Sequence, residues 1–167
     1  MTPDLSLVQL DLRLVELAIC NLLLVVLVID HEPQVRRFLR AALEASTYPV
    51  HDTFTGKAGP EQAALQRPDV VILDFNSTDM DGLQVLSRLR EWSRVPVIVL
   101  SVRGADAGKI ALLDAGAEDF LTKPLSIGEL LARLRVAATC PAIRRVSRVP
   151  LRQAHGRSGA PPGRDRG

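Results

Sequence analysis

The sequence predicts an α/β protein in which a doubly wound, five-stranded parallel sheet carries helices on both faces. Three runs, residues 22–29, 70–73 and 96–100, are rich in Val, Ile and Leu and too uniformly apolar for a sheet with one wet face. Segments whose apolar residues recur at helical spacing alternate with these runs. The composition, with 47% hydrophobic and 24% charged residues, is typical of a globular protein with one core.

Five strands and five helices are predicted in alternation. The strands are, in chain order, residues 22–29, 49–54, 70–73, 96–100 and 118–122. The second and the fifth carry the weaker apolar signal. The helices are placed by apolar stripes within residues 35–43, 63–65, 83–89, 110–113 and 130–134. This alternation implies right-handed crossovers, which put helices on both faces of a parallel sheet.

The 167 residues divide into three parts of different composition. Residues 22–140 hold all the predicted strands and helices and form the single domain. In residues 1–21, the leucines at positions 7, 10, 14 and 17 share one helical face, which predicts an amphipathic helix. Residues 141–167 contain seven arginines against one aspartate, with four prolines and four glycines. This basic tail cannot bury enough apolar surface to offset its ordering entropy and is predicted to be disordered.

The composition disfavours several functional classes. Aromatic residues make up only 4%, which leaves little material for stacking nucleic-acid bases. Cys20 and Cys140 are far apart, so neither a disulfide framework nor a structural zinc site is indicated. The longest charge-free apolar stretch, residues 17–29, is shorter than the about 20 residues of a membrane span. The N-terminus also lacks the early basic residues of a secretory signal, so we expect a cytoplasmic protein without a membrane span.

Polar residues follow four of the predicted strands at the point where each strand ends. They are Asp30 after the first strand, Asp74 after the third, Ser101 after the fourth and Lys123 after the fifth. Because the carboxyl ends of parallel strands open on one edge of the sheet, these side chains are expected to converge. Carboxylates suit a hard divalent cation and lysine offsets phosphoryl charge, so the group predicts phosphoryl transfer onto Asp74. For a single aspartate of this kind, helix capping is the alternative.

Five motifs occur at or near these strand ends. In chain order they are Val-Ile-Asp-His-Glu-Pro at 28–33, Val-Val-Ile-Leu-Asp at 70–74, Asp-Met-Asp-Gly at 79–82, Val-Ile-Val-Leu-Ser at 97–101 and Leu-Thr-Lys-Pro at 121–124. Together they resemble the CheY-like receiver domain of bacterial response regulators, which has a (βα)5 flavodoxin-like fold. The resemblance covers about residues 24–139, within the domain predicted at 22–140. Residues 91–103 and 127–135 resemble the winged-helix transcription-regulator subfamily and, within it, the Kdp potassium-response regulators.

The resemblance implies a role for each residue at the strand ends. Asp74 resembles the phosphoacceptor, which receives a phosphoryl group from a sensor histidine kinase. Ser101 resembles the switch hydroxyl, and Phe120 the aromatic side chain coupled to it. Lys123 resembles the lysine that pairs with the phosphoryl oxygens, and the peptide bond before Pro124 is expected to be cis. Asp74, Ser101 and Lys123 are therefore the predicted phosphotransfer residues of a switch that is not an enzyme.

The metal site implied by the resemblance is altered in this chain. The family pattern implies Mg²⁺ held by Asp30, Asp74 and the backbone carbonyl of Asn76. His31 stands where the family has a second aspartate, and imidazole is a poor ligand for Mg²⁺ but a better one for zinc, cobalt, nickel or copper. Mg²⁺ affinity and phosphorylation are expected to fall unless Glu32 reaches inward or another divalent metal serves. The alternative is that His31 caps the following helix.

Dimer contacts and an output domain are the subfamily's other features. The subfamily dimerises through the fourth helix, fifth strand and fifth helix of the domain, and Lys109, Asp119 and Arg133 stand near the places of its interface charges. Their alternative role is as solvated surface charges. No recognition helix can be read after residue 140, so this chain is expected to lack the DNA-binding domain and to bind no specific DNA sequence. Truncation and a stand-alone receiver both remain open.

Two functional classes follow. In the first, transfer to Asp74 shifts a two-state equilibrium and changes contacts with a partner or in a dimer. In the second, the chain is a pseudo-receiver that binds partners without phosphorylation because His31 disables the metal pocket. Phosphorylation of His31→Asp but not of the natural sequence would favour the second class.

Overall fold

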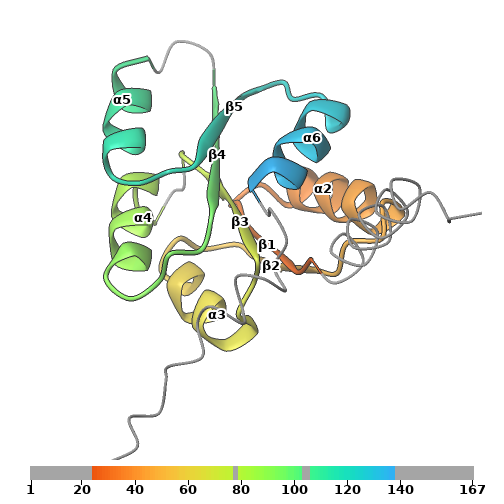
Figure 1. Ribbon diagram of the computed structural model, residues 1–167, viewed down its shortest axis with the longest axis horizontal. Helices are drawn as coiled ribbons and strands as arrows, with labels where there is room; N and C mark the ends of the chain where they lie inside the picture. Colours follow the sequence, from red (N-terminus) through yellow and green to blue (C-terminus); the bar gives the residue numbers. More distant parts are fainter. Residues whose placement is uncertain (1–23, 77–78, 103–105, 138–167) are drawn as a thin grey trace, which may run out of the picture.

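The computed structural model describes residues 24–76, 79–102 and 106–137. Within them, five parallel strands form one sheet in the order β2-β1-β3-β4-β5, and helices cover both of its faces (Figure 1). The predicted fold class is therefore confirmed. The predicted amphipathic helix at 1–21 and the predicted disordered tail at 141–167 lie outside the described residues.

Each predicted strand and helix corresponds to an observed element. The strands are β1 (Val26–Ile29), β2 (Val50–Thr53), β3 (Val70–Asp74), β4 (Val97–Val102) and β5 (Asp119–Lys123). The helices are α2 (Pro33–Ala45), α3 (Ala58–Gln66), α4 (Gly82–Arg90), α5 (Asp106–Asp114) and α6 (Ile127–Ala137).

The first strand begins later than its apolar run predicts. β1 starts at Val26, although Leu24 is already 1% exposed and packs into the core. The backbone N–H of Val25 donates to the Asp69 carboxylate (2.9 Å) and not to a neighbouring strand. The apolar run therefore reports burial, which extends further along the chain than the strand hydrogen bonds do.

Both faces of the sheet are buried because alternate strand residues point to opposite sides. The α2/α6 core lies on one face and includes Val28, Ile72, Leu39, Leu43, Leu130 and Leu134. The α3/α4/α5 core lies on the other face and includes Leu27, Val71, Ala63, Val85, Leu86 and Leu112. Full burial of each large aliphatic side chain contributes about 1.5–3 kcal/mol, so both helical layers hold the sheet in place.

Strand register determines which residues meet at the carboxyl edge. β1 and β3 pair with Ile29 opposite Leu73. Asp30, directly after β1, and Asp74, the last residue of β3, therefore lie at the same edge of the sheet. Asp74 pairs with Leu100, which precedes Ser101 in β4. The pairing of β4 with β5 brings Lys123 to the same edge. Residues up to 93 positions apart in sequence are thus brought within hydrogen-bonding distance.

None of the helices in the described part of the chain has both the length and the apolar character needed to cross a bilayer.

Candidate functional site

Two buried aspartates and one lysine form the centre of the site. Asp30 directly follows β1, Asp74 ends β3, and each is 1% exposed. Lys123 ends β5, and its Nζ lies 3.0 Å from Oδ1 of Asp74 and 3.1 Å from Oδ2 of Asp30. The peptide bond between Lys123 and Pro124 is cis, as predicted. The expected convergence of these strand ends is therefore observed, with one ammonium group bridging two carboxylates.

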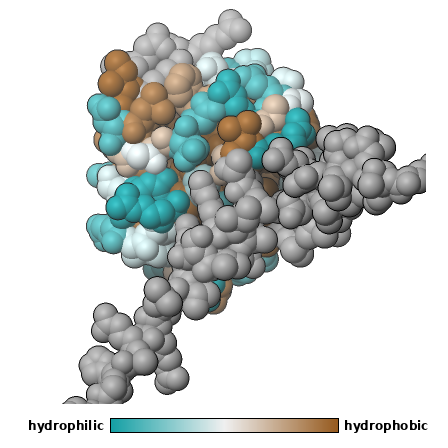
Figure 2. Space-filling view, viewed as in Figure 1, coloured by the Kyte–Doolittle hydropathy of each residue, from teal (hydrophilic) through white to brown (hydrophobic). Residues whose placement is uncertain are grey.

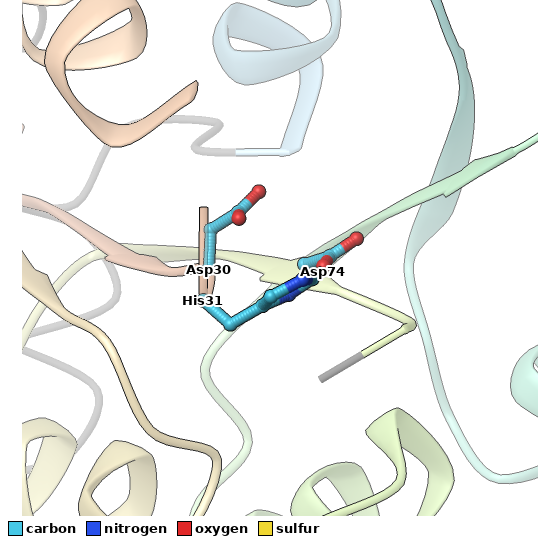
Figure 3. Close-up of side chains that lie close together, drawn as sticks. All are labelled: Asp30, His31 and Asp74. Carbon is cyan, nitrogen blue, oxygen red and sulfur yellow. Dashed lines mark hydrogen bonds and ion pairs between the residues drawn. The ribbon is translucent and has the colours of Figure 1, made fainter. Parts of the chain in front are cut away.

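His31 contacts the second oxygen of Asp74. Its Nδ1 lies 3.0 Å from Oδ2 of Asp74, and the close-up shows the ring directed toward that carboxylate (Figure 3). A carboxylate can only accept, so this hydrogen bond needs the proton on Nδ1. The alternative that His31 caps the next helix is wrong, because the N-cap of α2 is Glu32 and no side chain caps it.

All four carboxylate oxygens of Asp30 and Asp74 have a protein partner. The backbone N–H of Glu32 donates to Oδ1 of Asp30 at 2.8 Å, and Lys123 and His31 satisfy the other three oxygens. Asp30 thus also supports the turn into α2, although it accepts from Glu32, which precedes the helix, and does not cap it. This pairing is what makes two buried negative charges tolerable at one edge of the sheet.

Burial and neighbouring charges shift the pKa values of Asp30 and Lys123 upward. Burial raises the pKa of the Asp30 carboxyl; the Glu32 N–H opposes this, the charge of Asp74 adds to it, and Lys123 opposes it. Burial lowers the pKa of Lys123, but the hydrogen bond and charge of Asp74, followed by those of Asp30, outweigh burial, so the Lys123 pKa is raised. Lys123 is therefore held as a cation between the carboxylates.

Ser101 brings an unpaired hydroxyl to this edge. Ser101 is 1% exposed, and its Oγ has no hydrogen-bond partner among the described residues. A buried hydroxyl without a partner costs about 1–3 kcal/mol, so its retention calls for an explanation. Phe120, predicted to be coupled to Ser101, is partly buried against the α3/α4/α5 core. A ligand oxygen placed among these groups would satisfy the hydroxyl.

The other predicted ligands lie at the rim. Glu32 has a half-exposed side chain, and its Oε1 is 3.5 Å from Lys123 Nζ. Within the described residues, the group that could hold a metal ion consists of Asp30, His31 and Asp74, and Glu32 is not in it. Asn76 is exposed in the turn after β3, where its carbonyl could be a further ligand. The sequence left both His31 and Glu32 as possible metal ligands, and of these two side chains His31 is the one that lies beside both aspartates.

Two further residues, Arg36 and Asp79, hold the backbone around the site, and the sequence alone did not indicate these contacts. Nη1 of Arg36 donates to the backbone carbonyl of Asp30 at 2.7 Å, which holds the chain where it enters the pocket. The Asp79 carboxylate accepts from the backbone N–H groups of Gly56 (2.8 Å) and Lys57 (3.1 Å), which ties the loop after β3 to the start of α3. The Asp-Met-Asp-Gly motif at 79–82 is visible in the sequence, but no local pattern indicates that Gly56 and Lys57 are the partners of Asp79.

On the predicted dimer face, Arg133 forms ion pairs with two carboxylates. Nη1 of Arg133 on α6 lies 2.5 Å from Oδ2 of Asp119 on β5, and Arg133 also contacts Glu129. The side chain of Lys109 lies outside the described residues. The two predicted charges that are described therefore pair with each other within the chain.

Most of the described part of the chain is similar to a known family of domains. The family model of the response regulator receiver domain matches residues 26–135. This chain belongs to the response regulator receiver family. It is 52% identical over 112 residues to the KDP operon transcriptional regulatory protein KdpE of Escherichia coli (strain K12), covering 67% of this chain and 50% of that protein. It is 51% identical over 112 residues, with the same coverage, to transcriptional regulatory protein KdpE of Mycobacterium tuberculosis (strain CDC 1551 / Oshkosh).

Solved structures are similar over the same region. The receiver domain of the Francisella response regulator 1452 has 31% identity and a TM-score of 0.65, covering 69% of this chain and 96% of that one. The receiver chain thus spans about half the length of the curated KdpE relatives and nearly the whole of a solved receiver domain.

The donors of this receiver do not fit Mg²⁺, the ion that the family implies. Mg²⁺ prefers oxygen ligands in a near-ideal octahedron, whereas one of the three side chains here is an imidazole. The imidazole also takes the place of a carboxylate of the family pattern, which removes one negative charge. The pocket is therefore less negative and contains a donor that Mg²⁺ binds poorly.

Proposed function

We propose that this receiver accepts a phosphoryl group on Asp74 from a sensor histidine kinase and thereby changes its contacts with a partner or a second copy. The observation that carries the proposal is Lys123 bridging the buried Asp74 and Asp30 carboxylates. Lys123 is placed to offset charge on an incoming phosphoryl group. The unpaired Ser101 hydroxyl supports the same conclusion, because it is available to a new oxygen at this edge.

The transfer follows from the positions of these groups. An oxygen of Asp74 attacks the phosphorus of the phosphohistidine, an O–P bond forms, and the N–P bond of the kinase breaks with its electron pair returning to the imidazole. Both oxygens of Asp74 are hydrogen bonded, so attack releases one bond, either to Lys123 or to His31. The phosphoryl oxygens then compete for Lys123 and Ser101, which redistributes hydrogen bonds across β3, β4 and β5.

The proposed output is a change at the face formed by α5, β5 and α6. Ile110 and Leu113 of α5 are 66% and 44% exposed, and Figure 2 shows hydrophobic surface over α5 at the upper left of the view. The Asp119 and Arg133 pair borders this face. We propose that two copies of the chain form a homodimer through this face. We place this dimer in the cytoplasm, with a role in transcription regulation. Any DNA-binding output would need residues outside the receiver.

The alternative is a pseudo-receiver that works without phosphorylation. It is favoured by one observation, the His31 imidazole hydrogen bonded to the would-be phosphoacceptor in place of an acidic metal ligand. In that case, weak Mg²⁺ binding would mean that this receiver has lost the ability to be phosphorylated on Asp74.

Intact mass spectrometry of the full chain separates the two functions. The chain is incubated with a small acyl phosphate and Mg²⁺, Mn²⁺ or Co²⁺ in separate reactions, and we expect a gain of about 80 Da, the mass of a phosphoryl group, with at least one of these ions. Asp74→Asn should remove the gain, whereas Asp114→Asn, at an exposed position on α5, should keep it. Uptake by His31→Asp alone, with none by the natural sequence under any of the three cations, would favour the pseudo-receiver and overturn our proposal.

A further inference from the structure

We propose that Asp30, His31 and Asp74 form a site for a divalent transition-metal ion that binds imidazole nitrogen, of the Co²⁺, Ni²⁺ and Zn²⁺ class, in preference to Mg²⁺. The inference rests on the proposed receiver function and specifies the ion at its phosphoacceptor. It departs from the Mg²⁺ that the family implies, because it depends on the one side chain in which this pocket differs.

The donor atoms lie close together, and two of them already have the spacing of ligands that share an ion. One ligand atom from each of the three residues lies within 4.8 Å of the other two. Nδ1 of His31 and Oδ2 of Asp74 are 3.0 Å apart. Two ligands at right angles, each about 2.1 Å from a metal, are separated by about 3 Å. An ion can therefore replace the proton between these two atoms with little movement of either side chain, leaving the imidazole proton on Nε2.

Ligand chemistry selects the class of ion. Carboxylates bind both Mg²⁺ and transition metals, so Asp30 and Asp74 alone discriminate weakly. Imidazole adds affinity for Co²⁺, Ni²⁺ and Zn²⁺ and little for Mg²⁺. Because His31 stands where the family pattern has a carboxylate, the pocket also has one negative charge fewer, which weakens the electrostatic attraction on which Mg²⁺ depends. The same substitution therefore lowers the affinity for one class of ion and raises it for the other.

Neighbouring groups hold the ligands in position. The Glu32 N–H holds one oxygen of Asp30 at 2.8 Å and leaves the other toward Lys123. The Arg36 guanidinium holds the carbonyl of Asp30, the residue directly before His31. Contacts of this kind orient metal ligands, and their loss commonly costs about 10–100-fold in affinity. The His31 side chain is 28% exposed, so solvent and ions can reach its ring.

Direct metal binding to the full chain tests the inference. The chain is stripped with a chelator, and Co²⁺ binding is followed by its visible absorption and by calorimetry, with Mg²⁺ titrated separately. Cys20→Ser, Cys140→Ser and His155→Gln are introduced throughout so that soft donors elsewhere do not compete. His51→Gln, which removes a partly buried imidazole on β2, is the matched control.

The decisive quantity is the ratio of Co²⁺ to Mg²⁺ affinity. We expect His31→Asp and His31→Asn each to lower this ratio by at least about tenfold relative to the background chain, while His51→Gln leaves it unchanged. Thermal melting of each variant shows whether it is folded. An equal ratio in folded His31→Asp and the background chain overturns the inference.

The result is separable from the proposed function. Binding is read without any phosphodonor, so His31-dependent Co²⁺ selectivity in a chain that never gains a phosphoryl group would contradict phosphorylation and support the metal site. Phosphorylation of Asp74, together with a Co²⁺ to Mg²⁺ affinity ratio that is the same with and without His31, would support the proposed function and contradict the metal site.

Discussion

At the scale of the residue, Lys123 is the side chain that keeps the candidate site folded. Asp30 and Asp74 are almost completely buried, and Lys123 donates to both. Removing one member of a buried ion network leaves an uncompensated charge and is strongly destabilising. The role proposed for Lys123 in offsetting phosphoryl charge and its role in stability therefore depend on the same two contacts.

We predict that Lys123→Met lowers the free energy of unfolding by about 2 kcal/mol near neutral pH in the presence of a chelator. Because the pKa of Lys123 is raised above 10.5, its stabilising effect is complete below that pH and is lost as the pH rises through the folded-state value. Urea unfolding at several pH values measures the difference, which should close only under strongly alkaline conditions. Lys57→Met, at an exposed position, should change stability little. Equal stability of Lys123→Met and the natural chain would contradict this account.

At the scale of the element, the connection from β3 to α4 determines where the loop after Asp74 runs. The N–H of Gly82 donates to the carbonyl of Phe75 (3.2 Å), and Asp81 caps α4 by accepting from the N–H of Leu83. A Cβ at position 82 would lie 2.9 Å from Cα of Phe75, closer than real contacts allow. Glycine is required there because backbone passes directly against the helix start.

We predict that Gly82→Ala lowers the free energy of unfolding by about 1–3 kcal/mol, because the added methyl group overpacks against backbone that cannot move aside. Gly128→Ala is the control at a second helix start, where the nearest atom to an added Cβ is Oγ of Ser126 at 3.8 Å. That variant should be neutral or slightly more stable, since alanine restricts the unfolded chain. Chemical denaturation of both variants provides the test, and equal effects would show that the close approach to Phe75 is not limiting.

At the scale of the whole molecule, one sheet couples two cores that share no helix. Leu39 belongs to the α2/α6 core, and Trp92 follows α4 on the opposite face. Every strand contributes buried residues to at least one of these cores, and the central strands contribute to both. Loss of packing on one face should therefore loosen the other face as well.

We predict that Leu39→Ala lowers the free energy of unfolding by about 2–5 kcal/mol, the usual cost of a cavity left by a buried leucine. Trp92 is the single tryptophan of the chain, so its fluorescence reports on the opposite face. Fluorescence and far-UV circular dichroism should give the same shifted midpoint. Leu65→Ala, at a position 71% exposed on α3, should have little effect. Separate transitions by the two probes would mean that the faces unfold independently.

The strand and helix alternation could be predicted because it depends on periodicity, which is local. Two details were not predictable in this way. Leu24 has the apolar character of a strand residue and is buried in the α2/α6 core, but it lies before the start of β1. The sequence allows His31 to be a helix cap or a metal ligand. The 3.0 Å distance from its Nδ1 to Oδ2 of Asp74 places it at the carboxylate and not at the helix.

The sequence by itself determined the parallel sheet, the order of its elements and the polar residues at the ends of its strands, because each is encoded over a few neighbouring positions. The tertiary structure alone decided that Lys123 bridges two carboxylates, that His31 rather than Glu32 lies beside Asp74, and that the Ser101 hydroxyl is buried without a described partner. The reason is physical: His31 and Asp74 are 43 positions apart, and Lys123 and Asp30 are 93 apart. Their contacts exist only once strand register has brought the strand ends together.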